Sequence, residues 1–235
     1  MADATRPALN GFDPADPAFR LFAGGVAHDF SNFLTIISGF AQLLRAQYKD
    51  DAELAESLRE ILVACERGGG MIEQLAVLAA QRPMQLASVT MPAGLEAMLP
   101  ALRARAGEGL TLEWQPGAAA ALRADAARLQ QVFELLCEHA RAELPKGGMV
   151  RLSGPAGANG REAELVFQIV GCAPLKPELL GAMFQPFHLK TYGKRGYGLG
   201  LAVAHALVAQ HGGRLTAESA PTTGLTFHLF LPLAS

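Results

Sequence analysis

Apolar residues at helical spacing dominate the first third of the chain. After a tail rich in Pro, Asp and Ala (1–18), the apolar positions are three or four residues apart, as in a heptad helix. A polar stretch at 47–51 precedes a second apolar series, which keeps its register if Gly68 occupies a seam position, and Pro83 marks its end. The two series are Phe22, Val26, Phe30, Phe33, Ile37, Phe40 and Leu44, then Leu54, Leu58, Ile61, Cys65, Ile72, Leu75 and Ala79. The pattern predicts an antiparallel helical hairpin over 19–84.

The apolar stripes of this hairpin are too wide to be buried by one helix pairing with the other. A second copy of the hairpin would cover them by completing a four-helix bundle. We therefore expect a homodimer.

A different pattern begins near residue 85, where short alternating stretches typical of strands are interleaved with helical ones. Strands are expected near 111–114, 150–152, 165–170, 214–218 and 225–231, with a turn at 221–224, and helices near 92–105, 125–143 and 198–211. We interpret 155–160 as a plain loop. The fold class is therefore α+β, a helical hairpin followed by an α/β sandwich over 85–235.

Composition narrows the function classes. The 235 residues carry a net charge of -2 without a run of like charge, which argues against a nucleic-acid partner. No apolar stretch is long enough to span a bilayer, and the N-terminus lacks the pattern of a signal peptide. Cys65, Cys137 and Cys172 match no metal motif, which suits buried thiols in a reducing compartment. We expect a cytoplasmic protein without a membrane partner.

One face of the first predicted helix presents a candidate catalytic histidine, His28. At 100° per residue His28 lies about 200° from Val26, so it points away from the apolar seam. Small or polar residues share this outward face, although glycine in a helix costs ~1 kcal/mol relative to alanine. They are Gly24, Gly25, Ser31, Asn32, Thr35 and Gly39. A large partner must approach here, and we expect Gly25, Ser31, Thr35 and Gly39 to dock it.

Asp29 and Asn32 flank the imidazole of His28. A carboxylate that accepts the proton of one ring nitrogen fixes the tautomer and makes the other nitrogen a better nucleophile. We therefore predict covalent catalysis by His28, with Asp29 and Asn32 as its catalytic partners.

The segment 28–35, His-Asp-Phe-Ser-Asn-Phe-Leu-Thr, resembles the phosphoacceptor box of bacterial sensor histidine kinases. The similarity continues through 61–67, through Phe184-Gln185-Pro186-Phe187, which is similar to the F box, and through the glycine-rich 196–201, and it covers about residues 20–232. It implies that the C-terminal domain has the fold of the kinase ATPase domain. Backbone amides at the glycine-rich turn before a helix can cradle phosphate.

The resemblance fails at the other nucleotide contacts of that family. His139 stands where the second Asn of the N box would hold Mg²⁺, and imidazole is a poor ligand for this ion. Val170 stands at the Asp that recognises adenine, and Cys172 and Pro174 at the following glycines. We interpret these four residues, together with Gly196, Gly198 and Gly200, as a vestigial nucleotide site that holds no metal ion. The alternative is that Glu134, Glu138 or Glu143 replaces the Asn as the metal ligand. ATP binding is then expected to be weak or absent.

A phosphoacceptor hairpin with a degenerate ATPase domain resembles the dimeric histidine phosphotransferases of phosphorelays. This implies that His28 relays a phosphoryl group between response-regulator receiver domains without ATP, that a hybrid kinase is the donor, and that the receiver supplies Mg²⁺. Three alternatives stay open: an ATP-dependent histidine kinase core, a receiver phosphatase that uses Asn32, and a scaffold that binds a receiver without chemistry.

Overall fold

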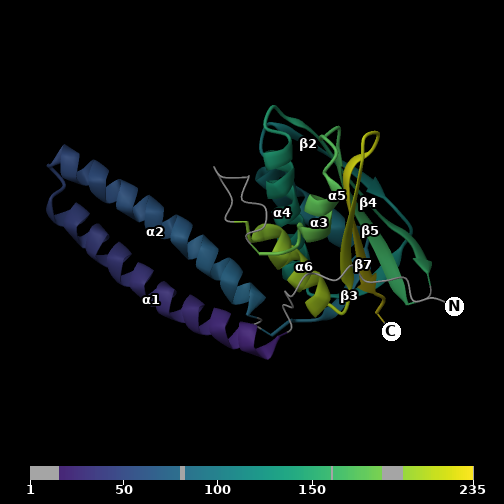
Figure 1. Ribbon diagram of the computed structural model, residues 1–235, viewed down its shortest axis with the longest axis horizontal. Helices are drawn as coiled ribbons and strands as arrows, with labels where there is room; N and C mark the ends of the chain where they lie inside the picture. Colours follow the sequence, from purple (N-terminus) through teal and green to yellow (C-terminus); the bar gives the residue numbers. More distant parts are fainter. Residues whose placement is uncertain (1–15, 80–82, 160, 187–197, 235) are drawn as a thin grey trace. The chain divides into compact units, whose positions relative to one another are not determined.

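The computed structural model describes residues 16–79, 83–159, 161–186 and 198–234 (Figure 1). The chain divides into two compact units between residues 82 and 83. The first is a pair of helices and the second combines helices with β-sheet. Each unit is described by itself.

The first unit is the predicted helical hairpin, formed by α1 (Pro17–Gln47) and α2 (Ala52–Leu78). Asp16 and Asp51 precede the two helices, and each carboxylate accepts a hydrogen bond from a backbone N–H of the first turn, that of Ala18 at 2.9 Å and that of Leu54 at 3.0 Å. These caps satisfy donors that have no partner within a helix. Pro17 and Ala18, which were expected in the tail, already belong to α1 because proline is well suited to the first helical position.

The two helices pack through small residues of α1. Ala23, Gly24, Ala27 and Ala41 are its buried positions, so the prediction that Gly24 points outward is wrong. On α2, a Cβ atom built on Gly68 would lie 3.1 Å from Leu34 Cδ1, which is closer than most side-chain contacts. Gly68 therefore does occupy a seam position, and the helices approach closely there.

The large apolar side chains of α1 remain outside this contact. Phe22 is 69% exposed, Phe33 57% and Phe40 64%, whereas the predicted seam residues Leu58, Cys65 and Ile72 of α2 are buried. The apolar stripe of α1 therefore does not pack against α2. An exposed surface of this size is typical of an interaction site.

The second unit is an α/β sandwich. Its elements are β1 (Ala87–Met91), α3 (Ala93–Ala106), β2 (Leu110–Pro116), β3 (Ala120–Ala124), α4 (Ala126–Glu143), β4 (Gly148–Asn159), β5 (Glu162–Val170), α5 (Pro177–Ala182), α6 (Gly200–Gln210), β6 (Arg214–Ala220) and β7 (Gly224–Pro232). Five strands form a sheet in the order β2-β4-β5-β7-β6, with β2 and β4 parallel and the other pairs antiparallel. Strands β1 and β3 pair separately.

One face of the five-stranded sheet forms the core with the helices α3, α4 and α6 (Figure 1). Buried and half-exposed residues alternate along β5, as expected for a strand with one covered face. At the centre, Phe167 of β5 lies between Phe133 of α4 and Phe227 of β7, with ring centroids 6.5 and 6.4 Å away. These aromatic residues, like Phe184, are buried core residues.

The predicted α/β elements are confirmed, with three additions and one correction. Strands β1 and β3 and the short helix α5 were not expected. The interpretation of 155–160 as a loop is wrong over its described part, because β4 continues to Asn159 through register shifts between Ser153 and Ala158. A proline in a strand is tolerated at such irregularities.

Two further expectations concern the thiols and the membrane. Cys65, Cys137 and Cys172 are buried, as predicted, and burial raises the pKa of the Cys137 thiol to about 12. Within the described residues, none of the helices has the length and apolar character needed to cross a bilayer.

Candidate functional site

His28 lies on the surface of α1, where its side chain is 73% exposed. Its Nδ1 atom is 3.1 Å from Oδ1 of Asp29, and Nδ2 of Asn32, one helical turn further on, is 3.5 Å from the same Nδ1. The structure therefore brings the three predicted catalytic side chains together.

The two contacts on Nδ1 are not equivalent. A neutral imidazole has one protonated and one unprotonated nitrogen, so Nδ1 cannot donate to Asp29 and accept from Asn32 at once. The shorter contact favours the tautomer in which Nδ1–H donates to Asp29. Nε2 then carries the lone pair and faces solvent on the exposed side of the helix.

The four predicted docking residues, Gly25, Ser31, Thr35 and Gly39, are all exposed on α1. A Cβ atom built on Gly25 or Gly39 would have no neighbour within 4 Å, so this chain's own packing does not require glycine there. The Thr35 hydroxyl donates to the Ser31 carbonyl at 2.8 Å and is thus already engaged by its own helix.

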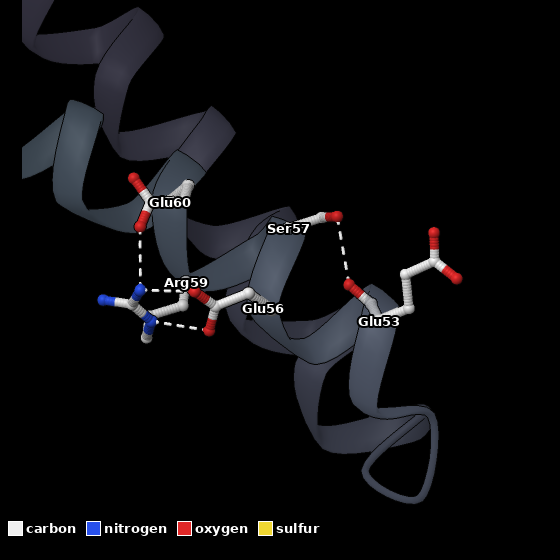
Figure 2. A network of polar contacts seen from close by, with 5 residues as sticks. All are labelled: Glu53, Glu56, Ser57, Arg59 and Glu60. Atoms are coloured by element: carbon white, nitrogen blue, oxygen red, sulfur yellow. Dashed lines mark hydrogen bonds and ion pairs between the residues drawn. The ribbon is translucent and has the colours of Figure 1, made fainter.

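An open groove runs between the two helices beside this surface. It is lined by Ser31, Thr35 and Ser38 of α1 and by Cys65, Glu66 and Gly69 of α2, among others. Toward the beginning of α2, Arg59 binds Glu56 with two hydrogen bonds of 2.9 and 2.5 Å and contacts Glu60 at 2.8 Å (Figure 2). These exposed ion pairs support the helix and contribute little to stability.

His139, predicted at the position of the magnesium ligand, lies inside the second unit rather than at a surface. Its side chain is only 7% exposed, its ring meets the edge of Phe227 with centroids 5.8 Å apart, and Nε2 lies 3.5 Å from Oε1 of Glu143. Burial lowers the pKa of His139 to about 4, so the imidazole is neutral at pH 7. The contact with Glu143, four residues further along α4, was not foreseen, although the spacing of the two residues could have indicated it.

The predicted adenine side of the site also lacks an acceptor. Val170 is the last residue of β5, Cys172 is buried with its Sγ 3.5 Å from the Ile169 carbonyl, and Pro174 is exposed in the segment before α5. The side chains at these positions are apolar or weakly polar. They cannot accept the two hydrogen bonds of an adenine amino group as a carboxylate can.

The glycine-rich turn before α6 is better suited to bind a phosphate than the preceding positions are to bind Mg²⁺ or adenine. Gly198 adopts a φ of 71°, which favours glycine, and α6 begins at Gly200 without a side-chain cap at its N-terminus. Uncapped backbone N–H groups at a helix N-terminus can bind phosphate oxygens. Gly196 lies outside the described residues.

Taken position by position, the residues present do not fit Mg²⁺-ATP as a whole. The turn at α6 suits phosphate, whereas His139 is enclosed and the predicted adenine position offers no carboxylate. In the described part of the chain, no group of three or more His, Cys, Asp or Glu side chains could hold a metal ion.

Two protein families match the two units. Residues 20–82 match HisKA, the His Kinase A (phospho-acceptor) domain, and residues 124–235 match HATPase_c, the histidine kinase-, DNA gyrase B- and HSP90-like ATPase. The HisKA match includes His28, Asp29 and Asn32.

Several sensor kinases are similar to the chain along most of its length. Sensor kinase CckA of Brucella abortus is 28% identical to this chain, and the match covers 89% of this chain and 24% of CckA. Sensor histidine kinase ZraS of Klebsiella oxytoca is 29% identical, and the match covers 90% of this chain and 45% of ZraS. The chain thus spans less than half of either relative. The crystal structure of full-length ShkA in complex with AMPPNP has a TM-score of 0.70 at 22% identity and covers 91% of this chain and 46% of that one, which shows a common fold.

The fold and the two family matches define a two-domain protein of the histidine kinase class. More particularly, the chain has the two domains found in the core of sensor histidine kinases, a phospho-acceptor hairpin followed by an ATPase-type domain. The prediction of an ATP-free phosphorelay protein is therefore wrong, because the second unit matches the ATPase family and the relatives are sensor kinases. Departures at single positions do not outweigh a resemblance that spans both domains.

Proposed function

We propose that this chain is the catalytic core of an ATP-dependent sensor histidine kinase in which His28 is the phosphorylated residue. The observation that supports this most directly is the contact of His28 Nδ1 with Asp29 on an exposed helix face that matches the phospho-acceptor family. The match of the second unit to the ATPase family supports ATP as the donor.

The residues of α1 supply the nucleophile and its orientation. Asp29 accepts the Nδ1 proton, fixes the tautomer and stabilises the positive charge that develops on the ring. Nε2 then offers its lone pair to the γ-phosphorus of ATP, the bond from this phosphorus to the oxygen that bridges it to the β-phosphate breaks, and ADP leaves. The exposed position of His28 lets a large domain approach. Asn32 is a positioning residue, since its amide lies one turn further on.

Two partners follow from this proposal. The HisKA match and the exposed apolar stripe of α1 support a homodimer, and a receiver domain of a response regulator would take the phosphoryl group from His28. The exposed face with Gly25, Ser31, Thr35 and Gly39 is its proposed docking surface. The hybrid kinase expected as donor in the relay prediction has no support in the comparisons. A location in the cytoplasm stays a prediction.

The decisive experiment is phosphorylation of the purified chain with radiolabelled ATP and Mg²⁺, and separately with phosphoramidate, a small phosphoryl donor that needs no nucleotide site. We expect an acid-labile label on the wild type with either donor and none on His28→Gln. His228→Gln, a histidine substitution in the other unit, should keep the label.

Each outcome separates the remaining functions. Label that persists in His28→Gln, or no label from either donor, would contradict a phosphoacceptor role for His28. Label from phosphoramidate but not from ATP, even at millimolar nucleotide, would contradict the ATP-dependent kinase.

A further inference from the structure

We propose that helix α4 contributes no magnesium ligand, so that the ATPase-type domain binds nucleotide weakly and with an affinity that does not depend on divalent cations. The inference rests on the proposed function only in taking this domain as the nucleotide-binding one. The contacts of five side chains of α4 support it.

The first of these side chains is His139. Its ring packs edge-on against Phe227 in the core, and Nε2 lies 3.5 Å from Glu143. To reach a metal ion at the surface, the imidazole would have to leave both contacts and open the aromatic core. Imidazole is in any case a weaker ligand for Mg²⁺ than oxygen.

The three carboxylates that could replace it are each engaged elsewhere. Glu134 accepts a hydrogen bond of 2.7 Å from the Gln130 amide, Glu138 forms an ion pair with Arg105, and Glu143 contacts His139. Each partner restrains the orientation of its carboxylate, so to bind Mg²⁺ the group would have to turn away from this partner or share its oxygens between the partner and the ion. In addition, burial raises the pKa of Glu138, which disfavours its ionised form.

A fifth side chain of α4, that of Leu135, is apolar and packs at the start of α6. Leu135, one turn before His139, lies 3.6 Å from the place where a Cβ atom on Gly200 would be. The start of α6 therefore faces an apolar side chain of α4 instead of an oxygen ligand. Among the described residues, the uncapped N-terminus of α6 remains for a nucleotide, since its backbone N–H groups can bind phosphate oxygens without a protein-bound metal ion.

This arrangement is compatible with a kinase. ATP carries Mg²⁺ on its own phosphates, so loss of the protein ligand lowers affinity without removing the ion from the nucleotide. The consequence is a dependence on high nucleotide concentration.

The test is calorimetric titration of the full wild-type chain with ATP, once with Mg²⁺ and once with EDTA. We expect weak binding in both buffers, with two dissociation constants that agree within about threefold. Binding that tightens more than about threefold with Mg²⁺, or no heat of binding in either buffer up to millimolar ATP, would overturn the inference.

Three variants test whether a carboxylate of α4 acts as a ligand of Mg²⁺. Glu134→Gln, Glu138→Gln and Glu143→Gln, each checked for folding by circular dichroism, should leave the affinity in Mg²⁺ unchanged. Glu108→Gln, at an exposed carboxylate outside α4, is the matched control. A tenfold loss in any of the three, absent in the control, would contradict the inference. Because these are binding measurements, a missing label on His28 would contradict the proposed function and leave this inference intact.

Discussion

At the scale of single residues, two histidines show that the surroundings of an imidazole decide its chemical role. His28 is 73% exposed beside a carboxylate, whereas His139 is 7% exposed against Phe227. An exposed imidazole can accept a phosphoryl group. A buried one is held neutral and serves as a core side chain.

The contact of Asp29 with His28 predicts that Asp29→Asn slows phosphorylation of His28 by about 10²-fold, the usual range for a lost acid–base partner. The amide can no longer take the Nδ1 proton as a carboxylate does. Asn32→Ala should have a smaller effect, since Asn32 Nδ2 lies 3.5 Å from Nδ1 and cannot donate to that atom while Nδ1–H donates to Asp29. Initial rates of labelling give both numbers, and equal rates for wild type and Asp29→Asn would refute the role of Asp29.

The burial of His139 predicts a loss of stability on acidification. Its pKa is about 4 in the folded state and near 6.5 in the unfolded chain, so between these values the unfolded state binds more protons. Stability therefore falls as the pH drops from about 6.5 to 4, by about 3 kcal/mol at most. Denaturant unfolding at a series of pH values measures this slope.

The control for that slope is His139→Leu, which keeps an apolar side chain against Phe227 and removes the titrating group. Its unfolding free energy should depend less on pH over the same range. An identical slope in both proteins would assign the effect to other groups.

At the scale of elements, α1 uses its two apolar surfaces differently. Small residues face α2, and the aromatic stripe faces away from it. The close approach of Leu34 to Gly68 depends on the absence of a side chain at that position.

This packing predicts opposite effects for two glycine substitutions in α2. Gly70→Ala should stabilise the chain by about 1 kcal/mol, because a Cβ there has nothing within 4 Å and alanine favours the helix. Gly68→Ala should gain nothing or destabilise, because its Cβ would lie 3.1 Å from Leu34. Thermal unfolding of the two variants compares them directly, and an equal gain at both positions would contradict the close helix contact.

At the scale of the whole molecule, the chain combines a phosphoacceptor hairpin and an ATPase-type domain that differ in how they bury apolar surface. The α/β unit has its own aromatic core, whereas α1 leaves Phe22, Phe33 and Phe40 largely exposed. A second copy of the hairpin is the proposed cover.

The exposed stripe predicts that Phe40→Asp weakens self-association. Burying a charge at an apolar interface without a partner costs several kcal/mol, enough to shift the chain from dimer to monomer at micromolar concentration. Sedimentation equilibrium measures the shift. Gln42→Asp, on the same helix but about 200° round it from Phe40 at 100° per residue, should remain dimeric, and a dimeric Phe40→Asp would place the interface elsewhere.

The elements of this protein follow closely from local pattern. Heptad spacing predicted α1 and α2, and alternation predicted β2, β5, β6 and β7, since these periods report which residues can share a buried face. Strands β1 and β3 were not predicted because each is only five residues long, and three of the five residues of β3 are alanine. The continuation of β4 to Asn159 was not predicted because its Gly and Pro residues are typical of loops.

The sequence by itself determined the two units and the constellation around His28, because a helix places residues one and four positions apart at fixed directions. Only the tertiary structure decided which face of α1 meets α2 and where His139 lies, because both depend on residues distant in the chain. The enclosure of His139 by Phe227, 88 positions further along, is of this kind. A residue's type limits its chemistry, and the packing of remote segments decides whether solvent, substrate or metal can reach it.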